Sequence, residues 1–459
     1  MTENQILDCK HIHMIGIGGS SMSGLALLMK GKGYCVTGSD KSASDLTERL
    51  QDEGIKVFIG HAEENIQDAE LVVYSAAIRE TNPERIGAKK AGIPQLERCE
   101  LIEQLMYGAT YAVCISGTNG KTTTGAMLAQ AFLQSGVDPT IHLGGEFGFI
   151  GGGTKSGTDG GIILEACEYN SSFLHFSPTI AVITNISEDH LEYFGNIDNI
   201  ESAFCKFTEK IPQKGWCIAC GDDVRVRRVC LQANCHHITY GLNEANDLTP
   251  ANLVYGKDGK AEYDAVLNGR KIGHFHVGVP GEVNMLNSLA AIAVCFVKEL
   301  NLESVSRSLN SFSGVHRRFE YTGSTDGVMC YTDYGHNPIA IRNALKMAAI
   351  QPHREIWSVF QPHTFSRTKY LFEGFLTAFN DSNHVLITDI FAARETDPGD
   401  ISSEMLVKAM QKSGIDAHYT PGFDDAESYL RGHWQSGDLM ISHGCGDIAL
   451  LNKQILKTN

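Results

Sequence analysis

The sequence predicts an α/β fold organised as about three domains. Two glycine-rich turns each follow a strand-like apolar run and precede a helical pattern, which indicates two separate βα units. Further short apolar runs recur along the chain, and many of them end in polar residues, as the strands of an open parallel sheet do. A length of 459 residues is also typical of about three domains.

Composition excludes several classes of protein. The chain is 42% hydrophobic and 20% charged, which is ordinary for a soluble globular protein. No apolar run approaches the roughly 18 residues of a membrane span, and the segment 1–9 lacks the pattern of a secretion signal. A net charge of −16 argues against a nucleic-acid partner. We therefore expect a cytoplasmic protein with no membrane or nucleic-acid partner.

The first glycine-rich turn follows the strand-like run 11–15 and precedes the helical pattern 22–29. It would place helix amides against a diphosphate, and the next strand ends where a dinucleotide site holds a ribose hydroxyl. Ser21 replaces the third glycine of the nicotinamide fingerprint, so a different nucleotide diphosphate is favoured, and a nicotinamide cofactor and a purely structural turn stay open. The candidate binding residues of this segment are Gly16, Gly18, Gly19, Ser39 and Asp40.

The second turn, GTNGKTTT at 117–124, lies between the apolar run 111–115 and the helical pattern 125–132. Its glycines let backbone N–H groups close on phosphate oxygens, Lys121 reaches the terminal phosphates, and the Thr122 hydroxyl can bind Mg²⁺. Ile115 stands where the usual phosphate loop has its first glycine, so the loop is shortened. The motif predicts ATP binding, with a chance Gly-Lys-Thr turn as the alternative.

Polar residues follow two later strand-like runs of the central region. Glu165, Cys167 and Glu168 follow the run 161–164, and Asn185, Asp189 and His190 follow the run 179–184. Ligands of parallel α/β sheets lie outside the carboxyl ends of strands. We expect Glu168 and His190 to converge with Thr122 on the metal and the phosphates, although a carboxylate there can also cap a helix and a histidine can serve a turn.

The last third of the chain repeats this pattern. Arg317 and Arg318 are suited to stabilising phosphoryl charge or to forming an interdomain ion pair. Strand-like runs then end in polar clusters, and their recurrence favours a binding edge over separate solvated loops. The clusters contain Asp333, Tyr334 and His336, then His363, Ser366 and Arg367, and finally Asp389.

The thirteen cysteines are scattered and indicate reduced thiols that serve as small apolar residues. One group also offers zinc-ligand chemistry, but its first two members are three apart on an expected strand and would point to opposite faces. The sequence therefore disfavours a metal site there. The group consists of Cys217, Cys220, Cys230, Cys235, His236 and His237.

Ten segments resemble, in order and spacing, the cytoplasmic Mur ligases of peptidoglycan synthesis. The resemblance implies a Rossmann-like UDP-sugar domain at 1–107, a central P-loop ATPase-type α/β domain at 108–314, and a Rossmann-like domain at 315–459 that closes over ATP and the amino acid. The segments are GIGGSSMSGLA, GSD, YSAAI, GTNGKTTT, EACEYNSSFL, NISEDHLEYF, PGEVNMLNSLAA, GVHRRFE, TDYGHNP and FQPHTFSRT.

The reaction that the resemblance implies is ATP-dependent ligation of L-alanine to the lactyl carboxylate of UDP-N-acetylmuramate through an acyl phosphate. ATP and Mg²⁺ would be the cofactors, and the protein would be a monomer or a weak homodimer. The early glycine-rich segment, with DYGH and FQPH, favours the L-alanine-adding member of the family.

The resemblance also implies residue roles. The catalytic residues would be Lys121, Glu168, His190, Arg318 and His336, with Thr122, Glu168 and His190 as metal ligands. ATP would contact Gly117, Thr118, Asn119, Gly120, Lys121, Thr122, Thr123, Asn287, Arg318 and Asp333. Gly16, Gly18, Gly19, Ser39 and Asp40 would hold the UDP-sugar, and His363 and Arg367 would lie near the carboxylate and the amino acid. The sequence departs from the family pattern at Ser21, Asn119, Cys167 and Val283, and Lys206 does not match the register of the lysine that is carbamylated in some relatives.

Four alternatives stay open. A murein-tripeptide recycling ligase would share the scaffold and accept a peptide, and a folylpolyglutamate synthase would share only the central and C-terminal domains. A nicotinamide-dependent oxidoreductase would bind NAD at the first turn, and a non-catalytic UDP-sugar-binding protein would bind without releasing phosphate.

Overall fold

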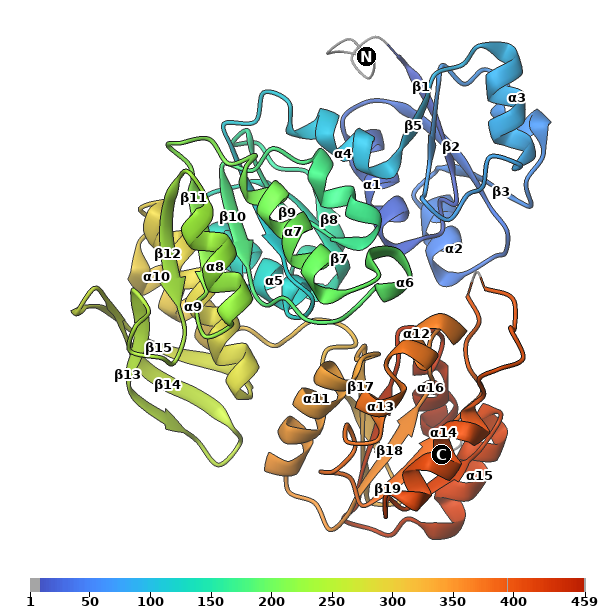
Figure 1. Cartoon of the computed structure of the whole chain (residues 1–459). Helices are drawn as coiled ribbons and strands as arrows, with labels where there is room; N and C mark the ends of the chain where they lie inside the picture. Colours follow the sequence, from blue (N-terminus) through green and yellow to red (C-terminus); the bar gives the residue numbers. More distant parts are fainter. Residues whose placement is uncertain (1–8, 394, 458–459) are drawn as a thin grey trace.

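A computed structural model describes residues 9–393 and 395–457 and contains three α/β units, each built on its own sheet (Figure 1). The expected α/β class with three domains is confirmed. The boundaries after residues 107 and 314 stay a proposal.

The N-terminal unit is a Rossmann-like parallel sheet in the order β3-β2-β1-β4-β5. The strand order reverses between β1 and β4, and ligands bind at such a switch point in open α/β sheets. The first glycine-rich turn follows β1 and so lies at this point. The elements are β1 (His11–Ile15), α1 (Ser20–Gly31), β2 (Cys35–Asp40), α2 (Asp45–Asp52), β3 (Lys56–Ile59), η1 (Glu63–Ile66), β4 (Leu71–Tyr74), α3 (Pro83–Ala91), β5 (Gln95–Glu97) and α4 (Arg98–Met106).

The central unit has a ten-stranded sheet in the order β15-β14-β13-β12-β11-β10-β6-β9-β7-β8. Strands β14, β15 and β8 are antiparallel to their neighbours, and the strands between them run parallel. The elements are β6 (Tyr111–Ser116), α5 (Lys121–Gln134), β7 (Thr140–Phe147), η2 (Gly148–Ile150), β8 (Gly152–Lys155), β9 (Gly161–Glu165), η3 (Tyr169–His175), β10 (Ile180–Ile183), α6 (Leu191–Phe194), α7 (Ile197–Thr208), β11 (Trp216–Cys220), α8 (Val224–Gln232), β12 (His236–Tyr240), β13 (Leu248–Tyr255), β14 (Lys260–Leu267), β15 (Arg270–Pro280), α9 (Glu282–Val297) and α10 (Leu302–Asn310).

The C-terminal unit is a six-stranded sheet in the order β16-β17-β21-β18-β19-β20, in which only β16 is antiparallel to its neighbour. The three central strands therefore end at one edge, where the polar clusters predicted from sequence follow them. The elements are β16 (Glu320–Thr325), β17 (Val328–Asp333), α11 (Pro338–Ile350), β18 (Ile356–Phe360), α12 (Phe365–Tyr370), α13 (Phe372–Phe375), β19 (His384–Ile387), α14 (Ser403–Lys412), β20 (Ala417–Tyr419), α15 (Phe423–His433), β21 (Leu439–His443) and α16 (Ala449–Lys457).

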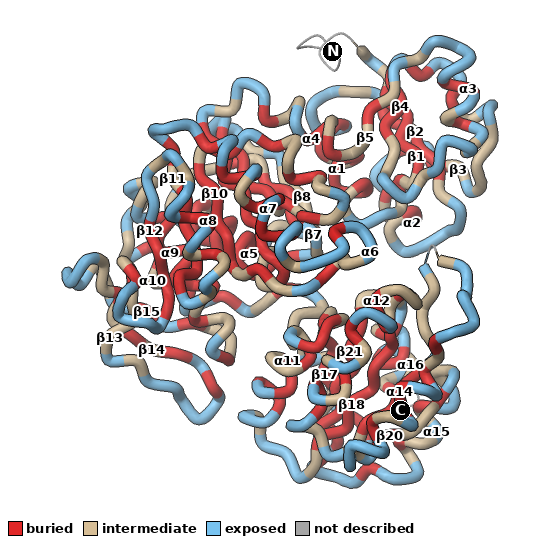
Figure 2. Tube along the Cα trace, viewed as in Figure 1, coloured by how far each residue is buried: buried red, intermediate tan, exposed pale blue. Residues whose placement is uncertain are grey.

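Burial explains why the strands read as continuous apolar runs. Strands β6, β10, β18 and β21 are buried along their whole length because helices cover both faces of the parallel sheets (Figure 2). One continuous core joins the N-terminal unit to one face of the central sheet, and a second core fills the opposite face. The C-terminal sheet has separate cores on its two faces.

The N-terminal unit is held against the central unit through α1, which packs on β7 and β8. Ser21 Oγ lies 2.8 Å from His142 Nε2 and accepts a hydrogen bond of 3.0 Å from Arg98. Burial lowers the pKa of His142 to about 3, so this imidazole is neutral. The departure from glycine at Ser21 thus supplies an interdomain hydrogen bond.

Candidate active site

The phosphate loop is held open by the neighbouring strand. The backbone N–H of Asn119 donates to Asn185 Oδ1 at 2.9 Å, and the Thr184 hydroxyl donates to the Asn119 carbonyl at 2.7 Å. Gly117 has a φ of +129°, and a Cβ there would lie 2.1 Å from Thr184 Oγ1, so no other residue fits. Gly120 has a φ of +88° and precedes α5 directly. The loop is thereby shaped before any ligand arrives.

Lys121 begins α5 and lies at the centre of the loop. Its ammonium group donates to the Gly117 and Thr118 carbonyls and to Glu168 Oε2, the last at 2.9 Å. Burial opposes the charge on Lys121, but the Glu168 carboxylate outweighs it and raises the pKa of the lysine above its ordinary value. The side chains are only 12% and 3% exposed, so the cation is held ready in a site from which water is largely excluded.

Thr122, the next residue, joins the phosphate loop to strand β9 of the same unit and to the C-terminal unit. Its hydroxyl donates to Glu165 Oε2 at 2.8 Å and accepts from Arg318 at 3.1 Å. Glu165 ends β9, whereas Arg318 comes from the segment just before β16. We predicted that Glu168 would converge with Thr122, but in the structure the carboxylate that Thr122 contacts is Glu165, and Glu168 pairs with Lys121.

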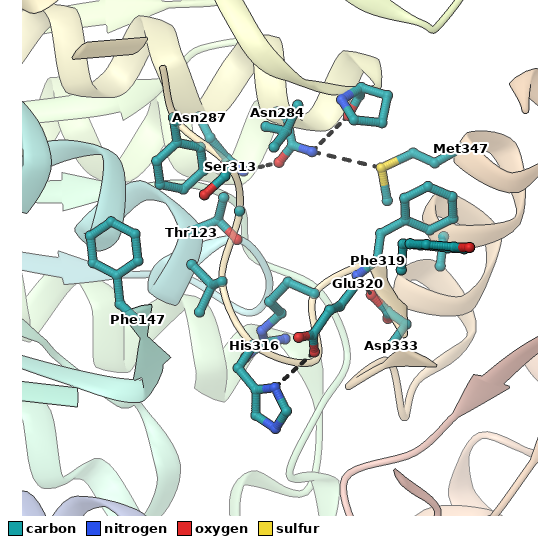
Figure 3. Close-up of a pocket in the computed structure, with 18 of the residues that line it drawn as sticks. Thr123, Phe147, Asn284, Asn287, Ser313, His316, Phe319, Glu320, Asp333 and Met347 are labelled. Carbon is teal, nitrogen blue, oxygen red and sulfur yellow. Dashed lines mark hydrogen bonds and ion pairs between the residues drawn. The ribbon is translucent and has the colours of Figure 1, made fainter. Parts of the chain in front are cut away.

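A cleft of about 760 Å³ opens beside the loop, between the central and C-terminal units (Figure 3). Asn284 spans it by donating to the Pro280 carbonyl at 2.7 Å and contacting Met347 Sδ at 3.7 Å. The departure at Val283 also lines this cleft and gives it an apolar side chain. Of the residues predicted to contact ATP, the cleft is lined by Asn119, Gly120, Thr123, Asn287, Arg318 and Asp333.

The C-terminal wall of the cleft is fixed by Asp333 at the end of β17. Its carboxylate accepts from the backbone N–H groups of Phe319 at 2.8 Å and Gly335 at 2.7 Å. Burial raises the pKa of Asp333 in spite of Arg318 nearby. Asn337 donates to Asn119 Oδ1 at 3.2 Å, so the loop after β17 contacts the phosphate loop itself.

A second cluster forms where α6 of the central unit meets the C-terminal unit. Arg367 Nε donates to Asp189 Oδ1 at 3.1 Å, and both side chains are at most 8% exposed. Arg367 also donates to His363 Nδ1 at 3.1 Å and lies 3.5 Å from His190 Nδ1. His336 Nε2 lies 3.6 Å from Asp189 Oδ2. Residues from three separate loops therefore meet around one buried carboxylate.

The cluster carries charge in a buried setting. Burial opposes ionisation of Asp189, but Arg367 overcomes it and holds the pKa of Asp189 well below its ordinary value. Burial likewise opposes the charged form of His336, yet Cys445 and Asp189 raise the pKa of this histidine to about 9. His336 is therefore a cation at neutral pH. The charge of His336, against the opposing effect of burial, in turn holds the pKa of the Cys445 thiol well below its ordinary value.

His190 has a φ of +53° directly before α6, in the left-handed region that is strained for residues other than glycine. Its ring lies 4.7 Å from the Tyr169 ring, measured between centroids, and its Nδ1 lies 3.5 Å from Glu192 Oε1. Tyr169 follows Glu168 in the chain. The residue that follows Glu168 in the chain therefore contacts His190, while the Glu168 side chain itself pairs with Lys121.

The residues predicted to bind the UDP-sugar lie in the N-terminal unit, and they are not among the residues that line the cleft. The backbone N–H of Gly18 donates to Asp40 Oδ2 at 2.9 Å, so Asp40 braces the first turn. The Ser39 side chain is fully buried and donates to Glu84 Oε2 at 2.5 Å. Their roles in binding stay predictions, as do those of Gly16, Gly18 and Gly19.

The cysteines of the group that the sequence disfavours as a metal site lie on β11, on α8 and just before β12. Cys217 is buried on β11, and the Cys230 thiol donates weakly to its carbonyl at 3.8 Å. Among residues 9–393 and 395–457, the one group of three or more side chains able to hold a metal lies elsewhere, at Glu262, His274 and His276. Lys206 is exposed in the last turn of α7.

Four residues around the phosphate loop and in the second cluster were not selected as site residues from the sequence: Glu165, Asp189, Asn337 and Cys445. Glu165 is the last residue of β9, Asp189 lies in the segment between β10 and α6, and their position one to three residues before a selected residue was the available signal. Cys445 lies between two glycines after the last strand, and nothing in its neighbours along the chain marks it.

Comparison with known proteins matches all three units. The Mur ligase family catalytic domain matches residues 11–110, the Mur ligase middle domain 115–295, and the Mur ligase glutamate ligase domain 317–446. A UDP-N-acetylmuramate–L-alanine ligase of Acetivibrio thermocellus is 43% identical over 100% of this chain and 98% of its own. One of Alkaliphilus metalliredigens is also 43% identical, over 99% of this chain and 98% of its own.

Solved structures agree with the fold. The UDP-N-acetylmuramate-alanine ligase of Thermotoga maritima superposes with a TM-score of 0.83 at 27% identity, over 98% of this chain and 99% of its own. A murein peptide ligase of Psychrobacter arcticus gives 0.76 at 21% identity over 98% of each chain, which shows the shared fold alone.

A phosphate loop that faces a cleft between α/β units, together with these matches, defines an enzyme of the ligase class. The chain belongs to the Mur ligase family. In the part of the chain that the structure describes, no helix has the length and apolar character that crossing a membrane requires.

Proposed function

We propose that the protein joins L-alanine to the lactyl carboxylate of UDP-N-acetylmuramate at the expense of ATP, as the names of its relatives in Acetivibrio and Alkaliphilus suggest. The observation that carries the proposal is the contact between the phosphate loop and the C-terminal unit, where Arg318 donates to Thr122 at 3.1 Å. A cationic group is thereby placed at the loop that would hold the γ-phosphate.

The first step follows from the chemistry of carboxylates, which do not acylate amines in water. A carboxylate oxygen attacks the γ-phosphorus of ATP, the bond from that phosphorus to the β,γ-bridging oxygen breaks, and ADP leaves with the electron pair. Lys121 and Arg318 would compensate the charge that accumulates on the phosphoryl oxygens. On ATP binding, Lys121 would exchange its contacts with the Gly117 and Thr118 carbonyls for phosphate oxygens.

The second step needs the amino acid beside the acyl phosphate. The neutral amine of L-alanine attacks the acyl carbon and a tetrahedral intermediate forms. The nitrogen then gives up one proton to the departing phosphate, which leaves as inorganic phosphate when the C–O bond breaks. Arg367 and His336 are cations in the second cluster, so they are suited to binding carboxylate and phosphate oxygens. No covalent enzyme intermediate is required.

Magnesium fits the donor set at the loop. Oxygen ligands suit Mg²⁺, and the Thr122 hydroxyl with the Glu168 carboxylate offers them beside the phosphates. Glu168 is nearly buried and is now paired with Lys121, a cation that phosphate would draw away. Thr122 and Glu168 would hold one ion and His190 a second, and the ions would neutralise phosphate charge when bound.

The experiment is a phosphate-release assay with ATP, Mg²⁺ and UDP-N-acetylmuramate. L-alanine, L-serine, glycine and a tripeptide are added in parallel, and the product is identified by mass. We expect release with L-alanine and a product heavier by one alanyl residue. Release only with tripeptide would instead identify a recycling ligase, and no release with any acceptor would overturn the proposed ligation.

A further inference from the structure

We propose a transition-metal site, suited to Zn²⁺, on the exposed face of the β14–β15 hairpin, formed by Glu262, His274 and His276. This hairpin lies at the edge of the central sheet, beside α10 (Figure 1). The site is separate from the Mg²⁺ and ATP residues proposed above, and it does not depend on the ligase reaction.

Strand geometry brings the three side chains to one face. In the antiparallel pair, Glu262 lies opposite His276, and Asp264 lies opposite His274. Residues two apart on a strand point to the same side. Buried residues alternate with these positions, since Tyr263 and Phe275 face the core. The two histidines and the carboxylates therefore share the outer surface by construction of the sheet.

The ligand atoms lie at the spacing that a metal ion requires. His274 Nε2 is 3.1 Å from Glu262 Oε1, and His276 Nδ1 is 3.5 Å from Glu262 Oε2. One ligand atom from each of the three side chains fits within a mutual distance of 4.8 Å. Tetrahedral zinc with bonds of about 2.0–2.2 Å separates its ligand atoms by roughly 3.4 Å. Small rotations of the side chains would complete the set.

Asp264 supplies the second observation. Its Oδ1 lies 2.7 Å from His274 Nδ1 and 2.7 Å from Lys271 Nζ, and its other oxygen accepts from Asn252 at 3.0 Å. This contact fixes the His274 ring so that its Nε2 faces the Glu262 carboxylate at 3.1 Å. Histidines that bind metals commonly donate their other N–H to a carboxylate in this way.

The donor chemistry selects the class of metal. Two imidazoles and one carboxylate suit Zn²⁺, Co²⁺, Ni²⁺ or Cu²⁺, whereas Mg²⁺ and Ca²⁺ prefer sets made only of oxygen. The side chains of Glu262, His274 and His276 are 45%, 46% and 47% exposed, so an ion reaches them from solvent and water completes its coordination.

The proposed metal site lies close to residues that line the cleft. The pairing register between β14 and β15 shifts between Lys260 and Glu262. Lys260 and Gly278, which line the nucleotide cleft, are each two residues from a proposed ligand. An ion that joins Glu262 to His276 would tie the two strands together next to this irregularity and stiffen that wall of the cleft.

The test is metal binding by the full-length protein after treatment with a chelator. Co²⁺ is titrated by visible absorption and Zn²⁺ by calorimetry, with the double variant His274→Ala/His276→Ala beside the wild type. We expect the double variant to bind one equivalent fewer. Asp264→Asn should weaken binding about 10-fold, because it removes the carboxylate that orients His274.

The matched control is His353→Ala, which removes an exposed histidine of the C-terminal unit. It should bind Zn²⁺ as the wild type does. Zn²⁺ should raise the melting temperature of the wild type and of His353→Ala, and it should raise that of the double variant less. His274, His276 and His353 are exposed and Asp264 lies on the outer face of the hairpin, so folding should persist, and circular dichroism checks it. Equal stoichiometry and affinity in the wild type and the double variant would overturn the proposal, whatever the ligase assay shows.

Discussion

The phosphate loop and the second cluster differ in how they are built. The loop obtains its shape from two adjacent parallel strands of one sheet, and Lys121 meets Glu168 within the central unit. The second cluster exists only where two units meet, because Asp189 and His190 come from one and His336, His363 and Arg367 from the other. The first therefore obtains its shape within one unit, whereas the second depends on the contact between two units.

This difference predicts two roles within the proposed reaction. A loop whose shape is already fixed loses less conformational entropy when it binds ATP. A cluster assembled by closure can respond to the second and third substrates, as in enzymes where closure completes the catalytic set. Loss of a loop residue should therefore abolish phosphoryl transfer, while loss of a cluster residue should also weaken the contact between the units.

The largest expected effect follows from Lys121→Ala. Removing a cation that would track the transferring phosphoryl group should lower turnover about 10³-fold while UDP-sugar affinity changes little. Steady-state kinetics and calorimetric titration of UDP-N-acetylmuramate measure the two quantities. Lys408→Ala, at an exposed lysine of α14, is the control. Turnover like that of the wild type would remove Lys121 from the phosphate site.

The second prediction concerns the cluster. Arg367→Ala leaves Asp189 buried without its main partner, which should cost about 3–5 kcal/mol of unfolding free energy and lower turnover roughly 100-fold. Urea unfolding measures the first quantity. Arg367→Ala combined with Asp189→Ala should recover part of the stability but not the turnover. If Arg367→Ala alone keeps full stability, the charge pair does not hold the units together.

The same pair sets a dependence on pH. The pKa of Asp189 is depressed in the folded protein, so its contribution to stability is present above its unfolded value of about 3.9 and disappears as the pH falls below that value. We expect the stability difference between the wild type and the double Arg367→Ala/Asp189→Ala variant to shrink on acidification. A constant difference between pH 7 and pH 3 would contradict this assignment.

The phosphate loop and the second cluster also differ in how well the sequence predicts them. The strands and helices could be placed from apolar periodicity, and the phosphate loop from residues adjacent in the chain, because both signals are local. The pairing of Thr122 with Glu165 could not be predicted, because both Glu165 and Glu168 lie near the end of the same strand and either could face Thr122. Only the placement of β9 beside β7 shows which one does, since the Gly144 N–H also donates to Glu165.

Several residues of the second cluster were predicted one by one, but the sequence did not show that they lie together. His190, His336, His363 and Arg367 were selected after three strands. Asp189, the partner of Arg367 and His336, was not selected, because its burial against Arg367 depends on the contact between the units. Cys445 was missed for the same reason, since its charge state depends on His336, which precedes it by more than a hundred residues. Contacts across separate sheets carry no periodic signal.

A smaller effect is expected from His190→Ala, which tests whether the cluster reaches the metal. Removing one proposed ligand should raise the Mg²⁺ concentration for half-maximal activity about 10-fold, while the KM for ATP at saturating Mg²⁺ changes little. His237→Ala, at an exposed histidine of the central unit, is the control. An unchanged Mg²⁺ titration would exclude His190 from the metal site and confine metal binding to the loop.

The last prediction concerns the charge of His336, which Cys445 helps to maintain. The folded pKa of His336 is about 9, above its ordinary 6.5, so the stability it contributes is complete below about pH 6.5 and is lost as the pH rises through 9. In Cys445→Ala the thiolate is absent, so the pKa should fall toward 6.5, at about 1.4 kcal/mol per unit. NMR titration of the ring measures this, with Cys35→Ala as the exposed control. A titration midpoint that stays near 9 would show that Asp189 alone keeps His336 charged, and the cluster would then depend on a single carboxylate.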